Sequence, residues 1–254
     1  MRTEILYEDK SIMVVRKPAG LAVQSAGIGQ PDVVSELKSY LAKLPGAERP
    51  GKGEPYLGIV HRLDQPVEGL LVFAKDKKAA AALSKQLTEG ALNKHYYAVL
   101  CGYPDCPEGD LVDYLRKEGN VAVAVTGREQ EFADAKIAAL HYRILEEINA
   151  PSPLALADVT IGTGRFHQIR VQFAHAGFPL FGDTKYGTAV LKEAMPAQKY
   201  RGVALCAYSL ELVHPVSGKK MGFRVVPKNP AFAGFTMEEL KKLTENETGI
   251  SKRG

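Results

Sequence analysis

The sequence predicts a protein of the α+β class. Short apolar runs typical of strands recur along its 254 residues, and four further segments show the start signals or spacing of helices. An apolar content of 45% and a charged content of 24% are ordinary for a soluble globular protein. At this length the chain can bury a core either as one large domain or as two small ones.

The first quarter of the chain predicts two strands and a helix. Residues 4–23 contain apolar runs that are broken by turn-forming residues at 8–10 and 18–20. Asp32 is placed to cap a helix, and Gly46 lies just beyond its end. The apolar stripe of this helix consists of Val33, Val34, Leu37, Leu41 and Leu44. Residues 45–56 are predicted to form a surface loop.

The next segment predicts a strand, a loop, a buried strand, a helix and a strand. Residues 57–60 lead into a turn-rich loop at 61–68, and the near-continuous apolar run at 69–75 indicates a central strand. Asp76 then caps a helix that stops at Gly90, and residues 94–102 return as a strand.

The second half predicts mostly strands. They are expected at 121–125, 135–148, 154–161, 203–213 and 221–226. Residues 165–177 have the character of a helix that is ended by Gly177. Residues 236–254 predict one further helix followed by a frayed polar end.

Composition and missing motifs narrow the possible functions. No secretory or membrane-spanning apolar run is found, and three cysteines are an odd number, so we expect a cytoplasmic protein without a disulfide framework or a membrane role. Cys101 and Cys106 lack a second ligand pair, which disfavours zinc. Phosphate-binding glycine loops, the metalloprotease histidine pair and the nucleophile elbow are all absent. A net charge of +4 permits a polyanionic partner.

Polar residues gather in the loop at 61–68, directly before the buried strand. In an extended loop, Arg62 and Asp64 point to the same side and Leu63 points into the core. A carboxylate at the edge of a sheet, in irregular backbone, is a common position for a functional group. An ordinary surface ion pair between Arg62 and Asp64 would give the same pattern.

A second polar cluster lies at the expected helix start and contains Arg165, His167, Gln168 and Arg170. Following Gly162-Thr163-Gly164, these side chains and the backbone N–H groups could meet phosphate, or they could form a solvated first turn. On the strand at 94–102, Tyr96 and Tyr97 face opposite sides, so one could stack on a base while the other packs in the core.

Taken together, these segments resemble the RluA-type pseudouridine synthases. IVHRLDQPVEGLLVFAK resembles the family's signature H-R-L-D loop and apolar strand, and KHYYAVLCG resembles its K-x-Y-x-A-x-V segment. GTGRFHQIRVQFAHAGFPLFGDTKYG resembles its T-G-R-x-H-Q-I-R helix and G-D-x-x-Y-G turn, and ILYEDKSIMVVRKPAGLAV resembles its opening. The resemblance extends from about residue 4 to residue 226.

The resemblance implies the pseudouridine synthase fold, in which helices flank a long, mostly antiparallel, bent sheet and a basic cleft crosses its middle. Residues 1–235 would form the catalytic domain, and residues 236–254 the C-terminal helix and tail. No small basic domain of the S4 type is seen before residue 4. Target selection would then rest on the catalytic domain.

The resemblance also implies an enzyme that isomerises specific uridines in ribosomal or transfer RNA without metal or cofactor. Asp64 would act on the ribose, either by attacking C1′ or by removing a sugar proton, with Arg170 as its cation. Tyr96 would stack on the uracil. Arg62 would fill the space that the flipped uridine leaves, while Arg165 and His167 would meet the RNA backbone. Structured RNA is the expected partner, and no obligate protein partner is implied.

Four positions depart from the family pattern. Gln65 replaces a common arginine, Val67-Glu68 replaces a more usual Thr-Ser, and Cys206 replaces a common histidine. The carboxylate itself is retained. An N-glycosidase would use a similar carboxylate but release free uracil, and a non-catalytic RNA-binding protein would not need Asp64, Tyr96 and Arg170 together.

Overall fold

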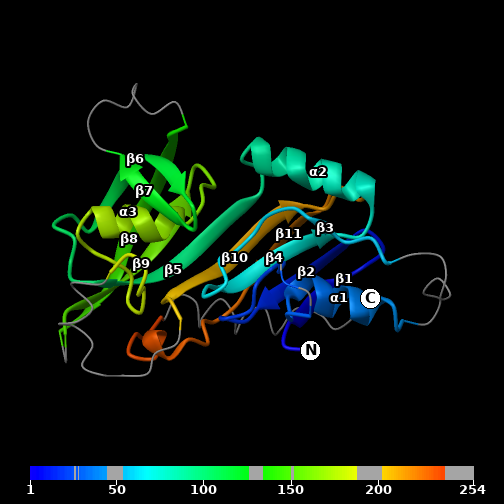
Figure 1. Cartoon of the computed structure of the whole chain (residues 1–254), viewed down its shortest axis with the longest axis horizontal. Helices are drawn as coiled ribbons and strands as arrows, with labels where there is room; N and C mark the ends of the chain where they lie inside the picture. The colour runs from blue at the N-terminus through cyan, green and yellow to red at the C-terminus, as the bar shows by residue number, and fades with distance from the viewer. Residues whose placement is uncertain are drawn as a thin grey trace. The chain divides into compact units, whose positions relative to one another are not determined.

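The computed structural model describes residues 1–25, 27, 29–44, 54–125, 134–149, 152–187 and 202–237 (Figure 1). Internal contacts divide the chain into two compact units. Unit 1 contains Met1–Lys94 and Ala207–Val225, and unit 2 contains the described residues within His95–Cys206 and Val226–Gly254. The chain passes between the units within β5 (Asn93–Cys101), again within β10 (Leu205–Val213), and a third time after Val225.

Unit 1 contains β1 (Glu4–Glu8), β2 (Ile12–Lys17), β3 (Gly58–Ile59), β4 (Glu68–Ala74), β10 and β11 (Lys220–Arg224), and its pairs β1–β2, β2–β4, β3–β4 and β10–β11 are antiparallel. The order across the sheet is β1-β2-β4-β10, with β3 also on β4 and β11 also on β10. Every residue of β2 and β4 is buried. Such complete burial explains the near-continuous apolar run of β4 and confirms its predicted central position.

Two helices of unit 1 begin where their aspartate caps predict. Asp32 accepts a hydrogen bond from Ser35 N at the start of α1 (Val33–Leu41), and Asp76 accepts one from Ala79 N at the start of α2 (Lys77–Thr88). Leu44, expected on the apolar stripe of the first helix, lies beyond its end.

Unit 2 contains an antiparallel run of strands in the order β5-β9-β8-β6-β7. These are β5, β6 (Glu108–Glu118), β7 (Val121–Val125), β8 (Lys136–Ile148) and β9 (Leu154–Ile161). Strand β6 was not predicted. Helix α3 (Gln168–His175) packs against β6 and β7, where Val171 contacts a core of Leu115, Ala122 and Ala138. A short 3-10 helix, η2, spans Pro230–Phe232.

The predicted helix at 165–177 is shorter than expected. It begins at Gln168 because His167 takes a left-handed backbone conformation with φ of 55°. Arg165 and His167 therefore lie in a turn that precedes α3, and the prediction that they belong to the helix is wrong.

The α+β class and the mostly antiparallel strands are confirmed. The bend of the sheet, the basic cleft and the boundary at residue 235 stay predictions. The expected surface loop at 45–56 and the C-terminal helix fall largely outside the described residues. None of the helices in the described part of the chain is long and apolar enough to cross a membrane.

Candidate active site

The loop that carries Asp64 is fixed at its beginning by a buried histidine. His61 is 7% exposed, and its Nε2 accepts a hydrogen bond from Val72 N of β4 at 3.2 Å. Burial and, to a lesser extent, the nearby positive charge of Lys94 lower the pKa of His61 to about 3. His61 is therefore neutral, and it acts as an acceptor that ties the loop to the strand. Leu63 is buried two residues later, as predicted.

The middle of the same loop is fixed by Lys17, which is fully buried at 0% exposure. Its ammonium donates hydrogen bonds to the carbonyl oxygens of Gln65 at 3.0 Å, Leu21 at 2.7 Å and Pro18 at 3.1 Å. The Gln65 carbonyl also accepts from Gly20 N at 2.8 Å. Two donors thus converge on the carbonyl of Gln65, the residue after Asp64.

The charge of Lys17 is balanced by acidic neighbours. Burial lowers its pKa, the negative charges of Asp64 and Glu68 oppose this, and the resulting pKa is about 7. Lys17 is thus a basic group close to Asp64 within unit 1. Sequence reasoning missed it, although the Lys17-Pro18 pair in the opening motif marked the position.

The departures from the family pattern have identifiable contacts. Glu68 is buried and pairs with buried Arg16 at 3.4 Å. Val67 is buried in the core, and the Gln65 side-chain amide donates to Gly20 O at 3.4 Å. Glu68 therefore holds this loop to β2, and Gln65 holds it to the turn that follows β2.

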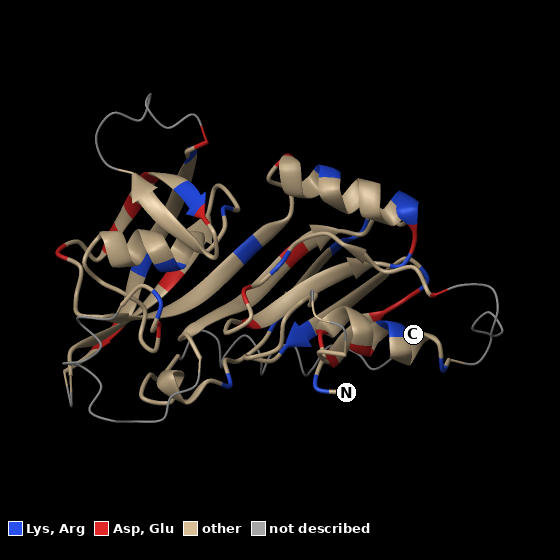
Figure 2. Ribbon diagram, viewed as in Figure 1, with Lys and Arg blue, Asp and Glu red and all other residues tan. Residues whose placement is uncertain are grey.

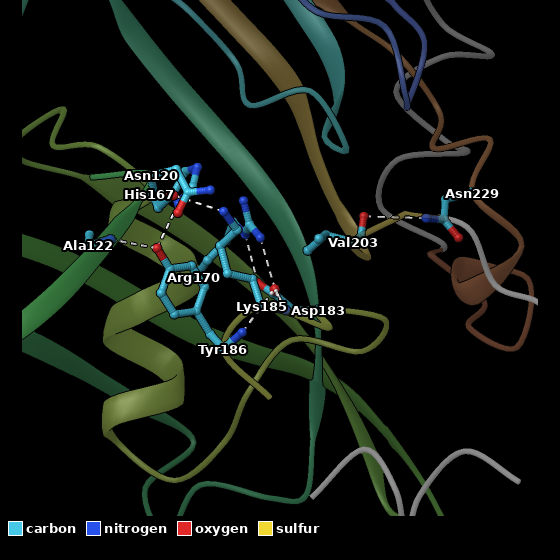
Figure 3. Close-up of polar contacts among 9 residues, drawn as sticks. All are labelled: Asn120, Ala122, His167, Arg170, Asp183, Lys185, Tyr186, Val203 and Asn229. Atoms are coloured by element: carbon cyan, nitrogen blue, oxygen red, sulfur yellow. Dashed lines mark hydrogen bonds and ion pairs between the residues drawn. The ribbon is translucent and has the colours of Figure 1, made fainter. Parts of the chain in front are cut away.

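In unit 2, Arg170 forms a bidentate pair with Asp183 (Figure 3). The distances are 2.7 Å from Nε to Oδ2 and 2.9 Å from Nη2 to Oδ1, and the two side chains are only 4% and 1% exposed. Asp183 Oδ1 also accepts from Lys185 N and Tyr186 N, so the G-D-x-x-Y-G turn wraps around this carboxylate. The guanidinium carbon lies 5.2 Å from the centre of the Tyr186 ring.

The Tyr186 hydroxyl connects β7 to the turn that precedes α3. It accepts a hydrogen bond from Ala122 N of β7 at 2.8 Å and lies 2.7 Å from His167 Nδ1 (Figure 3). Gln168 closes the preceding turn, because its Oε1 accepts from Arg165 N at 2.9 Å and from Thr163 Oγ1 at 2.7 Å. Asp183 and Tyr186 belong to the G-D-x-x-Y-G motif, but the sequence alone did not predict a role for either residue.

The structure brings Arg165, His167 and Arg170 together within unit 2. Arg165 Nε donates to Ile137 O at 2.9 Å. Tyr96 is only 4% exposed on β5, and Tyr97 is buried too. Asp64 and exposed Arg62 belong to unit 1, so the predicted pairing of Asp64 with Arg170 stays a prediction.

Metal-ligating side chains do not cluster in groups of three or more anywhere in the part of the chain that the structure describes. All three cysteines are free thiols, with Cys101 and Cys206 buried and Cys106 exposed.

Comparison with known protein families identifies the motifs. Residues 11–175, from β2 to the end of α3, match the model of the RNA pseudouridylate synthase family. The chain belongs to this family.

Curated relatives of this synthase family are similar over most of the chain. An uncharacterized RNA pseudouridine synthase from Synechocystis is 37% identical over 85% of this chain and 63% of its own length. Ribosomal large subunit pseudouridine synthases D from Zymomonas mobilis and Pseudomonas aeruginosa are 32% and 35% identical, over 68% and 66% of their lengths. The chain thus spans about two thirds or less of the relatives it matches.

Solved structures share the fold. Human RNA pseudouridylate synthase domain containing 1 superposes with a TM-score of 0.71 at 19% identity, covering 96% of this chain and 94% of its own. Human RNA pseudouridylate synthase domain containing 4 gives 0.69 at 24% identity, covering 94% and 93%. At these identities the likeness concerns the fold alone.

Proposed function

We propose that this chain isomerises uridine to pseudouridine in RNA and that Asp64 is the acting carboxylate. The observation that carries the proposal is the fixation of the Asp64 loop. His61 ties its beginning to β4, and Lys17 binds the carbonyl of Gln65, the residue after Asp64. A catalytic group must be held within a fraction of an ångström of its productive position, and a loop fixed by buried side chains provides that.

The reaction exchanges one bond to the ribose for another. The N1–C1′ bond breaks, the base turns, C5 bonds to C1′, C5 loses its proton and N1 gains one. Electrons are neither gained nor lost, so the reaction is an isomerisation. Asp64 serves either as the nucleophile at C1′ or as the base that removes a sugar proton.

The other residues carry supporting roles in this proposal. Arg62 is exposed, and its side chain forms no hydrogen bond or ion pair among the residues that the structure describes, so it is available to occupy the position of the flipped uridine. Tyr96 stacks on the uracil, and Arg170 supplies positive charge. Arg165 and His167 meet the RNA backbone next to the α3 turn.

The substrate that we propose is large-subunit ribosomal RNA. Several relatives at 32–36% identity are named as synthases of the ribosomal large subunit. Transfer RNA is the alternative that the same experiment tests. Pseudouridines are mapped in both RNA classes from cells with and without this protein, and loss of a site in ribosomal RNA alone is expected.

The role of Asp64 is tested with Asp64→Asn, which keeps the shape of the side chain but cannot act as base or nucleophile. We expect turnover in a tritium-release assay to fall by about a thousandfold or more, with RNA affinity and melting temperature nearly unchanged. Asp110→Asn is the matched control, because the Asp110 side chain is 73% exposed on β6. Turnover of Asp64→Asn within tenfold of wild type would exclude the assignment.

A further inference from the structure

One aromatic ring next to the α3 turn faces solvent. Phe166 is 40% exposed, although the phenylalanines of the core are nearly inaccessible. It lies between Arg165 and His167, in the turn that the left-handed backbone of His167 produces before α3. An exposed ring leaves apolar surface in water, and a binding partner that covers this surface gains free energy.

The ring of Phe166 is held rigidly from one side. The His167 imidazole stacks on it, with ring centres 3.8 Å apart and planes inclined by 22°. His167 is fixed in turn by the Tyr186 hydroxyl, which is bound to Ala122 N of β7 (Figure 3). Phe166 thus forms the exposed end of an ordered series of aromatic rings.

A cation lies over the same ring. The ammonium of Lys117, near the end of β6, is 4.9 Å from the centre of the Phe166 ring. Lys117 is exposed, and this contact with the ring is the only interaction of its ammonium among the described residues. Because His167 occupies one face at stacking distance, the ammonium lies over the other face or the rim.

More positive charge is attached to the same hairpin. Lys185 Nζ donates to Asn120 O in the β6–β7 turn at 2.8 Å (Figure 3), and Figure 2 shows basic positions on β6 and beside α3. An exposed aromatic ring with ammonium groups nearby matches the chemistry of single-stranded nucleic acid, which offers a flat base and a phosphate at each nucleotide.

We propose that Phe166 is a stacking site for an unpaired base of the RNA substrate, distinct from the uridine that is isomerised. Lys117 covers the free face of the ring in the absence of RNA and moves to a phosphate when a base takes its place. This inference rests on the proposed function, because it assigns a further contact of the same enzyme with its RNA. It adds a residue that reads the shape of the nucleotide and not its sequence.

The chain contains no tryptophan, which allows a direct test. Phe166→Trp introduces a single indole, whose emission is quenched when a base stacks on it. We expect a ten-nucleotide oligouridylate to quench the emission of Phe166→Trp, whereas tripolyphosphate, which carries charge without bases, leaves it unchanged. Val112→Trp is the matched control. Val112 is 60% exposed on the same strand as Lys117, at a position of opposite parity and therefore on the other face of β6.

A kinetic arm measures what the stacking contributes. In single-turnover assays on large-subunit ribosomal RNA, Phe166→Leu should raise the half-saturating concentration about 5- to 100-fold, with the saturated rate preserved. Phe166→Tyr keeps the aromatic face and should restore binding. Lys117→Gln should weaken binding and reduce the salt slope by about one.

The two proposals fail in different ways. If wild type converts uridine but oligouridylate quenches neither indole, or quenches both equally, the stacking site is refuted and the function stands. Equal half-saturation for Phe166→Leu and wild type also refutes it. If wild type converts no uridine in any RNA, the proposed function fails, whatever the emission shows.

Discussion

Replacing Arg170 by methionine leaves the Asp183 carboxylate in the interior without its cation. Asp183 is 0% exposed, so water cannot take the place of the guanidinium. Two charge-assisted hydrogen bonds, of 2.7 and 2.9 Å, are lost, and only the N–H groups of Lys185 and Tyr186 remain to Oδ1. Breaking a buried pair in this way costs about 3–5 kcal/mol of unfolding free energy.

For a chain of this size, such a loss lowers the melting temperature by roughly 6–20 °C. The second variant is Arg170→Met combined with Asp183→Asn, which removes both charges but keeps an oxygen that accepts from the two N–H groups. We expect it to recover at least half of the loss, because the two substitutions act on one interaction. Arg165→Met is the control, since Arg165 donates one hydrogen bond from a half-buried position and should cost less than about 1 kcal/mol.

The assay is unfolding in guanidinium chloride and by heat, followed by circular dichroism. The buried-pair explanation is refuted if the unfolding free energy of Arg170→Met lies within about 1 kcal/mol of the wild-type value. The same explanation is refuted if the double variant loses as much unfolding free energy as Arg170→Met and Asp183→Asn lose separately when added together. Such additivity would mean that the two charges do not depend on each other.

Two further predictions concern unit 1. Lys17→Met should cost about 3 kcal/mol at pH 7, because the carbonyls of Pro18, Leu21 and Gln65 all lose the Lys17 ammonium as a donor. Because the folded-state pKa of Lys17 is lowered to about 7, the unfolded chain binds more protons than the folded chain above pH 7. In denaturant titrations, the unfolding free energy of wild type should therefore rise by about 2 kcal/mol relative to that of Lys17→Met between pH 7 and 9. A constant difference would contradict this. Gly69→Ala should prevent folding, because Gly69 has φ of 129° and an added Cβ would lie 2.5 Å from backbone N and O of Ala207. A soluble Gly69→Ala protein with the wild-type melting temperature would contradict this prediction, because the backbone of Ala207 would then move away from the added Cβ at little cost in free energy.

Local signals were predicted from the sequence most reliably. Asp32 and Asp76 cap helices within three residues of themselves, so a short window contains the whole interaction. Strand β4 was recognised because both of its faces are buried, which makes its sequence continuously apolar. Strand β6 was missed because it mixes charged and apolar residues and buries little of either face.

Interactions between distant residues could not be predicted. The buried position of Lys17 depends on the carbonyl of Gln65, 48 residues away, and no local pattern records this. Arg170 and Asp183 are 13 residues apart on opposite sides of a turn, so spacing did not suggest a pair. The start of α3 was misplaced because His167 ends the turn by its backbone conformation and without a side-chain cap. The candidate residues themselves came from the family motifs, which record chemistry that periodicity does not.

The division of the chain has a consequence for its synthesis. Unit 1 begins at the N-terminus but takes β10 and β11 from Ala207–Val225, after most of unit 2 has been made. On the ribosome, the edge of β4 that β10 covers therefore pairs only with the two-residue β3 while residues 95–206 emerge, and its pairing is completed when β10 leaves the exit tunnel. Any nascent chain that stops before Val225 carries Asp64 on an unfinished sheet, so truncated products should bind chaperones or aggregate and should not act on RNA.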